Sequence, residues 1–278
     1  MGAICYFNAL TQALLSCSSF NQAVLTEGDK FESSVGKAVY EMMTKLPNIG
    51  GSNNVNVMNT VFEKAKERKD LSALIGGNQC CLEAYILLIE YIDSKCIERL
   101  FKHRFNEIIH CLKCDKMTMV QKKCDNIIFD VPSNFKFDDT NPSLQDFIKQ
   151  SLVTLVGNYK CTRCGSVDQK IKMEMLIMVP EIVVLVFQAG IPPNKLSIPE
   201  KFILPGEDDE KKDVPLEYNA VAQIEHSGTS TGGHYWAICK RNDGWYELND
   251  SSVSESQFGV TTNTYMVFYH IKEPFGSF

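Results

Sequence analysis

The sequence lacks the features that mark several common classes of protein. It has no excess of basic residues: 28 Lys and Arg stand against 34 Asp and Glu, for a formal net charge of −6. Since nucleic acid and anionic membranes are bound by basic surfaces, we expect neither as a partner. Residues 1–15 carry neither a basic flank nor a cleavage site, so we expect no secretory signal there.

Long hydrophobic runs and internal repeats are also missing. The most apolar stretch, residues 175–187, is interrupted by Pro180 and Glu181. It is too short to span a bilayer and predicts a buried strand. The rest is ordinary for a globular protein, with 44% hydrophobic and 22% charged residues in a chain of 278, enough to bury a sizeable core. The 11 cysteines, without an export signal, indicate an intracellular, reducing compartment, the cytoplasm or the nucleus.

The order of the expected elements predicts an α+β fold. Apolar spacing predicts helices over residues 6–15, 35–46, 57–65 and 80–92, and a capping pattern opens another at 142–152. Strand composition is found at residues 126–131, 182–187, 218–226, 234–240, 244–248 and 264–271. The segment RNDG (241–244) predicts a tight hairpin, and the charged run 206–213 predicts a solvated loop rather than a docking site. Helices first and a mainly antiparallel sheet later are typical of α+β proteins.

Four cysteines have the spacing of a metal site. The segment CLKC contains Cys111 and Cys114, and CTRC contains Cys161 and Cys164. Each pair places two thiolates on one tight knuckle, which is half of a tetrahedral zinc site. The sequence therefore predicts one closed, structural zinc ion that pins two distant segments together, and it gives no sign of an organic cofactor.

Other interpretations of these cysteines stay open. They can be unrelated, or one pair can be a redox pair, although two such units in one intracellular chain favour zinc. A zinc ribbon that binds nucleic acid is disfavoured by the acidic balance of the chain. Cys124 and His110 are further ligand candidates, but neither has a paired spacing.

Cys5 opens the first expected helix. One hypothesis is that it is a catalytic nucleophile; the alternative is an ordinary core cysteine. A helix N-terminus favours the thiolate, and a thiolate needs a base and a group that orients the base. The segment 232–258 runs from His234 through a hairpin, so that Asn249 or Asp250 is expected beside His234. Cys5, His234 and Asn249 have the Cys–His–Asn order of papain-like proteases. Among the other histidines, one also follows an expected strand, His226, and three lie in plainer contexts, His103, His110 and His270.

These segments resemble the ubiquitin-specific protease family. GAICYFNALTQALL (2–15) is similar to its Cys box, and GGHYWAICKRNDGWYELNDSSVS (232–254) is similar to its His box. The resemblance continues, in the right order, through GNQCCLEAYILLIEYI (77–92), LFKHRF with the two cysteine knuckles (100–164), YNAVAQIEHSG (218–228) and TYMVFYHI (264–271). It covers nearly the whole chain, so the motifs are specific as a set.

The resemblance implies a single catalytic domain, 1–278, with a papain-like fold. A helical thumb would cover about 1–98, zinc-binding fingers with some palm strands about 99–175, and a sheet palm about 176–278. It implies a thiol-dependent deubiquitinase that hydrolyses the isopeptide bond after the C-terminal glycine of ubiquitin. Cys5 would attack the carbonyl, His234 would act as base and then as acid, and Asn249 would orient His234, with Asp250 as a nearby helper.

The same resemblance implies the partners of the site. Ubiquitin and ubiquitinated proteins would bind, through Gln79 and Glu83 on the 77–92 segment and through Gly233 and Tyr235 beside the expected base. The chain would act as a monomer. Glu83 matches the helix residue that contacts the basic tail of ubiquitin.

Three departures from the family pattern leave alternatives open. The Asn that the family uses as an oxyanion donor would precede Met1, Cys80 stands where the family has Asp, and FQAG (187–190) replaces Leu-Lys-Arg-Phe. A weakly active or inactive ubiquitin-binding module and a protease for another ubiquitin-like modifier are therefore the alternative functions. A zinc protein that only mediates interactions would leave the Cys and His boxes unexplained.

Overall fold

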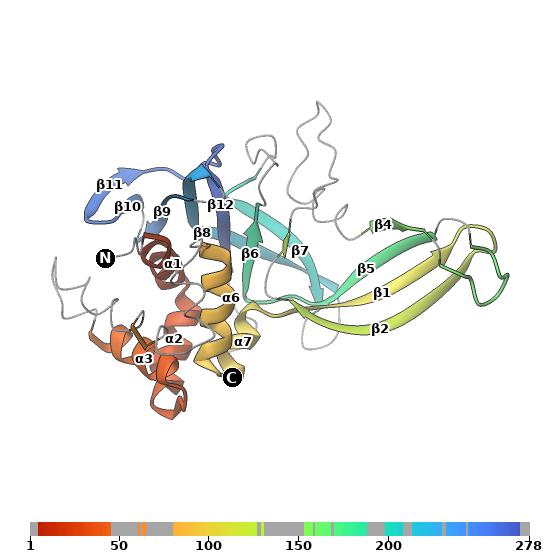
Figure 1. The fold of residues 1–278 in the computed structure, drawn as a ribbon, viewed down its shortest axis with the longest axis horizontal. Helices are drawn as coiled ribbons and strands as arrows, with labels where there is room; N and C mark the ends of the chain where they lie inside the picture. The colour runs from red at the N-terminus through yellow and green to blue at the C-terminus, as the bar shows by residue number, and fades with distance from the viewer. Residues whose placement is uncertain are drawn as a thin grey trace.

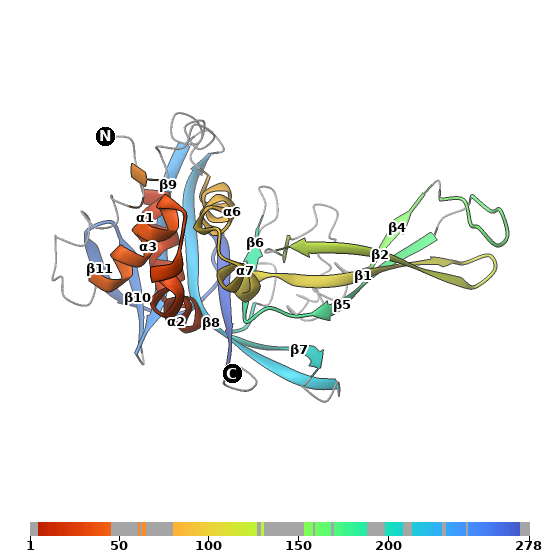
Figure 2. The ribbon, with the colours of Figure 1, turned by 90° about the horizontal axis from the view of Figure 1, so that it is seen from below.

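The computed structural model describes a helical unit and two β-sheets. The described residues are 5–45, 61, 63–64, 80–126, 129–130, 153–157, 159–167, 170–187, 198–207, 213–229, 232–242 and 244–272. The helices pack against the larger sheet, and the smaller sheet extends away from this body as an arm in both views (Figures 1 and 2).

The helical unit is built from the N-terminal third of the chain. Its members are α1 (Cys5–Leu15), α2 (Ser18–Glu27), the 3-10 turn η1 (Gly28–Lys30), α3 (Ser34–Lys45), α6 (Cys81–Ile92) and α7 (Lys95–Phe101). The predicted helices at 6–15, 35–46 and 80–92 are confirmed within a residue of their ends. The predicted helix at 57–65 lies almost entirely outside the described residues, and the one at 142–152 lies wholly outside them.

The larger sheet has eight strands, seven of them in the order β11-β10-β9-β8-β12-β6-β3, while β7 pairs with β8. Their bounds are β3 (Phe129–Asp130), β6 (Ile182–Val186), β7 (Lys201–Glu207), β8 (Asp213–Thr229), β9 (Gly232–Arg241), β10 (Gly244–Asn249), β11 (Ser252–Ser256) and β12 (Thr264–Ile271). All described pairs are antiparallel except β3 with β6. The α+β prediction is therefore confirmed.

The smaller sheet forms the arm, with strand order β2-β1-β5-β4. Its strands are β1 (His103–Cys111), β2 (Lys116–Asn126), β4 (Val153–Val156) and β5 (Lys170–Met178). The hairpin between β1 and β2 and the segment between β4 and β5 meet at the far end of the arm (Figure 1). Both cysteine knuckles therefore lie far from the helical unit.

The hydrophobic core lies between the helices and the larger sheet. Tyr85 of α6 is fully buried and makes edge-to-face contacts with Phe101 and Phe268, a favoured geometry for aromatic pairs. A second cluster covers the other face of the sheet, where Phe202 packs against Tyr218 and Tyr269. Both faces of the central strands are thus covered, which explains why β6 is buried along its whole length.

Two sequence predictions need correction. The apolar run 175–187 is not one buried strand: β5 ends at Met178 and β6 begins at Ile182, in different sheets. Pro180 lies at this boundary because it cannot donate to a strand ladder. The charged run 206–213 is not all loop either, since Glu207 of β7 pairs with Asp213 of β8.

The hairpin prediction at 241–244 is confirmed, because Arg241 of β9 pairs with Gly244 of β10. Asn242 between them has φ of 53°, the left-handed conformation that the favoured two-residue hairpin turn requires. None of the described helices is long and apolar enough to cross a membrane.

Candidate functional site

Cys5 is the first residue of α1, and its side chain is only 6% exposed. Cys81 of α6 lies close by and donates to the backbone carbonyl of Tyr6 over 3.5 Å. Burial, then the neighbouring thiols of Cys81 and Cys5, raise the pKa of Tyr6 to about 12. Cys5 therefore lies in a tightly packed, thiol-rich setting.

His234 lies in β9 and Asn249 ends β10, and these are the two strands of the tight hairpin. Nε2 of His234 is 2.7 Å from Oδ1 of Asn249. A carbonyl oxygen only accepts, so Nε2 carries the hydrogen and Nδ1 of the neutral ring holds the lone pair. Trp236 stacks on the imidazole at 6.0 Å between ring centroids. The ring is thus fixed in one orientation and one tautomer.

Asp250, the other candidate orienting residue, occupies the next turn. It is exposed and has φ of 52° between β10 and β11, where Asn249 pairs with Ser252. The left-handed conformation suits a short Asp side chain in a tight turn. Of the two candidates, Asn249 is the one that contacts His234 in the described structure.

Helix α1 packs against β9, so the Cys5 and His234 segments are neighbours. Arg241 at the end of β9 donates to the backbone and side-chain oxygens of Gln12, each over 3.0 Å, and also to the hydroxyl of Ser16. At the other end, burial and then the thiols of Cys81, Cys80 and Cys5 raise the pKa of Tyr235. Cys5 and Tyr235, the residue after His234, are therefore brought near each other from opposite ends of the chain.

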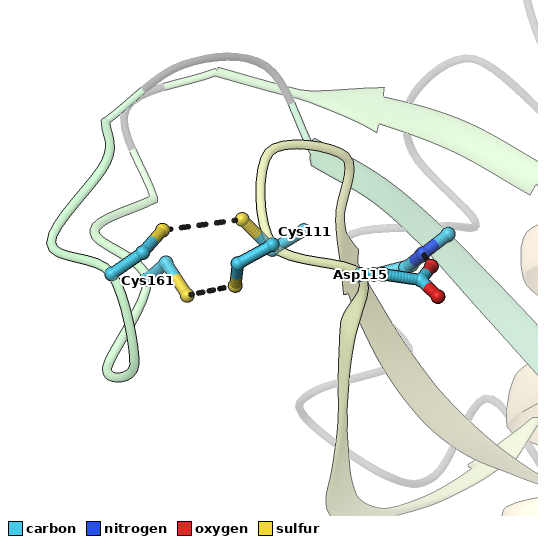
Figure 3. Close-up of polar contacts among 6 residues, drawn as sticks. Cys111, Asp115 and Cys161 are labelled. Carbon is cyan, nitrogen blue, oxygen red and sulfur yellow. Dashed lines mark hydrogen bonds and ion pairs between the residues drawn. The ribbon is translucent and has the colours of Figure 1, made fainter.

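The second site is the four-cysteine cluster at the end of the arm. The Sγ atoms of Cys111, Cys114, Cys161 and Cys164 all lie within 4.8 Å of one another. The pairs Cys111–Cys164 and Cys114–Cys161 are each 3.7 Å apart, drawn as dashed lines in Figure 3. With Zn–S bonds of about 2.3 Å, a tetrahedral site needs sulfurs about 3.8 Å apart. The residues present therefore fit a structural zinc ion.

Both knuckles are built in the same way. The backbone N–H of Asp115 donates to the carbonyl of Cys111 over 2.8 Å, and that of Gly165 donates to the carbonyl of Cys161 over 2.9 Å. Asp115 and Gly165 have φ of 56° and 67°, so each knuckle closes on a left-handed residue. The two turns present their thiols toward each other (Figure 3).

The knuckle backbones prepare some of the thiols for binding a metal. The N–H groups of Cys164 and Arg163 lower the pKa of Cys161 to about 6. Burial raises the pKa of Cys111, but the N–H groups of Cys114 and Lys113 outweigh it and give a net lowering. Burial raises the pKa of Cys114 to about 11. A cation is expected to replace that proton, because metals bind the thiolate.

The two further ligand candidates lie outside this cluster. Nε2 of His110 is 2.6 Å from Oδ1 of Asp115 and is engaged there instead. Cys124 lies opposite Phe105 in the β1–β2 register, near the other end of β1 from Cys111. The cluster therefore consists of the four paired cysteines.

Comparison with known proteins decides the family. The family model described as ubiquitin carboxyl-terminal hydrolase matches residues 1–269. The chain belongs to the ubiquitin carboxyl-terminal hydrolase family. Ubiquitin carboxyl-terminal hydrolase 11 of Schizosaccharomyces pombe is 22% identical over 304 residues, which cover 98% of this chain and 83% of that protein. Human ubiquitin carboxyl-terminal hydrolase 2 is 35% identical over 144 residues, 46% of this chain and 23% of that protein.

Solved structures confirm the papain-like fold. The SAGA Ubp8/Sgf11/Sus1/Sgf73 DUB module bound to ubiquitin aldehyde matches with a TM-score of 0.76 at 20% identity, covering 98% of this chain and 68% of that one. The module bound to monoubiquitin matches with a TM-score of 0.74 at 19% identity, with the same coverage. The chain spans only 18–34% of the length of the first three curated relatives that it matches.

Within this family fold, the predicted substrate-binding residues have different surroundings. Glu83 is exposed in the first turn of α6, and Tyr235 is buried in the core. Gly233 is packed so closely that a Cβ there would lie 2.6 Å from the carbonyl oxygen of Ser227 and closer still to the ring of His226. Gln79 lies outside the described residues.

Sequence reasoning assigned no role to two of the groups around Tyr235. His226 of β8 stacks on it at 4.3 Å between ring centroids, and Tyr265 of β12 contacts it edge-to-face. Cys80, at the N-cap of α6, has its Sγ 3.2 Å from the hydroxyl of Tyr265. His226 could have been found from the register of β8 with β9, which pairs it with Tyr235.

Proposed function

We propose that this chain is a thiol-dependent deubiquitinase that hydrolyses the bond after the C-terminal glycine of ubiquitin, in the cytoplasm or the nucleus. The observation that carries the proposal is the 2.7 Å contact between His234 Nε2 and Asn249 Oδ1, on a hairpin packed beside the helix that begins with Cys5. Family membership and the ubiquitin-bound structural neighbours support ubiquitin as the substrate.

The roles follow from the tautomer of His234. With hydrogen on Nε2, the Nδ1 lone pair is the base that takes the proton of Cys5. The thiolate attacks the glycine carbonyl, and the C–N bond breaks as the imidazolium returns its proton to the leaving lysine amine. Water, deprotonated by the same nitrogen, then hydrolyses the thioester and releases the ubiquitin carboxylate and the Cys5 thiol. Asn249 positions the ring and does not itself exchange protons, and Asp250 is proposed as a helper in the adjoining turn.

The four cysteines at the end of the arm are proposed to hold one zinc ion. The ion would supply folding energy rather than chemistry, because all four tetrahedral positions are filled by protein ligands. It would fix the geometry of the arm, which is proposed to act as the fingers that grip the substrate.

The test is covalent capture by ubiquitin that carries a C-terminal electrophile, read by intact-protein mass. The parent chain should gain one ubiquitin and Cys5→Ala none. Cys96→Ala is the matched control, because it removes a half-buried thiol of α7 that belongs to neither site and should keep the adduct. An adduct that survives Cys5→Ala, or is lost with Cys96→Ala, would assign the nucleophile to another residue.

A protease for another ubiquitin-like modifier is the second candidate, favoured by Cys80. Its thiol contacts Tyr265 in a position where the family pattern has an acidic residue. A neutral group there would favour a modifier tail with less positive charge. The same capture with a panel of modifier electrophiles decides between the two: a faster adduct with a different modifier would replace ubiquitin as the substrate.

A further inference from the structure

Lys170, the first residue of β5, is a fully buried lysine at the end of the arm. Lysine is rarely buried completely, because its ammonium group must exchange water for anionic or polar partners. A charged group in such a place needs compensating negative charge nearby. The described surroundings of Lys170 include both cysteine knuckles.

The side chain of Lys170 is hydrogen-bonded to the residue that follows the second knuckle, the turn of Cys161 and Cys164. Its Nζ donates to the hydroxyl of Ser166 over 3.2 Å. Ser166 is itself buried, and its backbone carbonyl accepts from the N–H of Cys161 over 2.8 Å. Lys170 is therefore two hydrogen bonds from a cysteine of the cluster.

The backbone of Lys170 pairs with the strand that leads into the first knuckle, the turn of Cys111 and Cys114. In the antiparallel register of β1 with β5, Lys170 lies directly opposite Cys111. Residues opposite each other share a face of the sheet, with Cβ atoms about 5 Å apart. Cys111 is as deeply buried as Lys170, so Lys170 lies where the two knuckles meet.

We propose that Lys170 is a positioning residue of the metal centre, and that it compensates the charge of the metal-bound thiolates. A divalent ion with four thiolates carries a net charge of about −2, since the ligands bind deprotonated. A fixed ammonium beside this charge stabilises the occupied centre over the empty one, and its bond to Ser166 holds the second knuckle in the closed arrangement. The inference rests on the proposed zinc site and is independent of the deubiquitinase activity.

A second lysine at this end of the arm is a weaker candidate for the same role. Lys116 donates to the hydroxyl of Thr162 over 2.9 Å, but this contact is exposed. Water and salt screen an exposed charge, whereas a buried one acts at full strength on its neighbours. The stabilisation is therefore assigned to Lys170.

The experiment compares Lys170→Met with Lys172→Met in the full chain. Lys172 lies two residues further along β5 and is paired with Glu107 over 3.5 Å, so its loss removes the same charge from the same strand. Zinc transfer to a chromophoric chelator should be about tenfold or more faster in Lys170→Met, the range typical of supporting groups around a metal. Lys172→Met should release zinc at the parent rate, and Lys170→Arg should restore most of the retention.

A spectroscopic readout separates charge compensation from a purely structural role. With Co²⁺ in place of zinc, removing the ammonium should shift the thiolate-to-cobalt charge-transfer band of Lys170→Met to lower energy, because the thiolate electrons are less stabilised. If Lys170→Met does not fold, Ser166→Ala keeps the charge and removes only its anchor, and should speed zinc release by a few fold. Equal release rates and unchanged bands in the parent and the folded Lys170 and Ser166 variants would overturn the inference. A parent chain that holds no zinc would instead overturn the metal site itself.

Discussion

Oδ1 of Asn249 lies 2.7 Å from Nε2 of His234 although the two residues are 15 positions apart. The tight hairpin makes this contact possible, because Arg241 pairs with Gly244 and the two strands run back along each other. An amide oxygen at this place holds the imidazole in the tautomer whose Nδ1 is free to accept a proton. The contact therefore links a local turn to the proposed general base.

Replacing Asn249 should lower catalysis without unfolding the chain. Asn249→Ala removes the acceptor, so the ring loses its fixed tautomer and kcat/KM on a ubiquitin substrate should fall by a factor of roughly 10² to 10⁴. Asn249→Asp keeps an acceptor and should retain far more activity. Ser254→Ala, on the exposed strand β11, is the control. Equal activities of the Ala and Asp variants would show that Asn249 does not orient His234.

The strand that carries the proposed base was predictable because part of it alternates between core and half-exposed positions. In β9, Tyr235, Ala237 and Cys239 are buried whereas Trp236 and Lys240 are half-buried, and a turn signal follows at once. The pairing of β9 with β10 could then be predicted from hairpin geometry alone. The assignment of Cys5 needed the family resemblance, since a lone cysteine at a helix start has no distinctive pattern of its own.

The arm was less predictable, for a physical reason. Its strands β1 and β2 cover no thick core, so Met117 and Met119 are exposed and charged residues lie among the apolar ones. Neither the alternation nor the continuous apolar run of a buried strand is present. Lys170 could not be predicted either, because sequence patterns place a lysine at the surface, whereas the structure buries it opposite Cys111.

Gly233 should be far less tolerant of substitution than Gly232. A Cβ at Gly233 would lie 2.6 Å from the backbone oxygen of Ser227 and would also meet the ring of His226, whereas at Gly232 it would meet none of the described atoms within 4 Å. Gly233→Ala must therefore displace the start of β9, which carries His234. Its thermal midpoint should fall by several degrees, since a loss of about 1 kcal/mol corresponds to 2–4 °C in a chain of this size.

Gly232→Ala is the matched control and should melt within about 1 °C of the parent. Differential scanning calorimetry of the two variants compares them directly. If both alanines are tolerated equally, the close packing at Gly233 does not constrain the strand. If Gly232→Ala melts normally but loses activity, the substrate backbone passes over residue 232.

The contact between His270 and α2 should make stability depend on pH. Nδ1 of His270 donates to the carbonyl of Ile271 over 2.7 Å, and Nε2 accepts from the backbone N–H of Ser19 over 3.2 Å. Burial lowers the pKa of His270, against the opposing effects of its bond to Ile271 and of the nearby Glu181 carboxylate. The folded chain therefore binds this proton less readily than the unfolded chain, in which the pKa is about 6.5.

The stabilisation by neutral His270 is thus fully present above about pH 6.5 and is lost as the pH falls below that value. His270→Gln keeps an acceptor for Ser19 and does not titrate. The free energy of unfolding, measured in urea between pH 7.5 and 5, should fall less steeply in His270→Gln than in the parent. Because half-buried His226 also has a lowered pKa, the difference between the two curves isolates His270. Parallel curves would show that His270 does not contribute to the acid sensitivity.

Loss of one zinc ligand should destabilise the arm without changing the chemistry at Cys5. Cys111 is 2% exposed at the end of β1, and Cys164 is the exposed member of the second knuckle. Replacing either by Ser leaves three thiolates, and metal binding supplies folding free energy directly. The variants should hold less zinc by elemental analysis, and should show a lower thermal midpoint or a loss of soluble protein.

Cys96→Ser is the control, since this half-buried thiol lies on α7 and its Sγ is 3.0 Å from the hydroxyl of Ser94, away from the cluster. It should keep the zinc content and the midpoint of the parent. Soluble Cys164→Ser should still react with a small thiol reagent at Cys5, because that residue lies in the helical unit and the cluster lies at the far end of the arm (Figure 1). If both ligand variants have the thermal midpoint of the parent and the parent contains no zinc, the fold holds the four thiols in this arrangement without a metal.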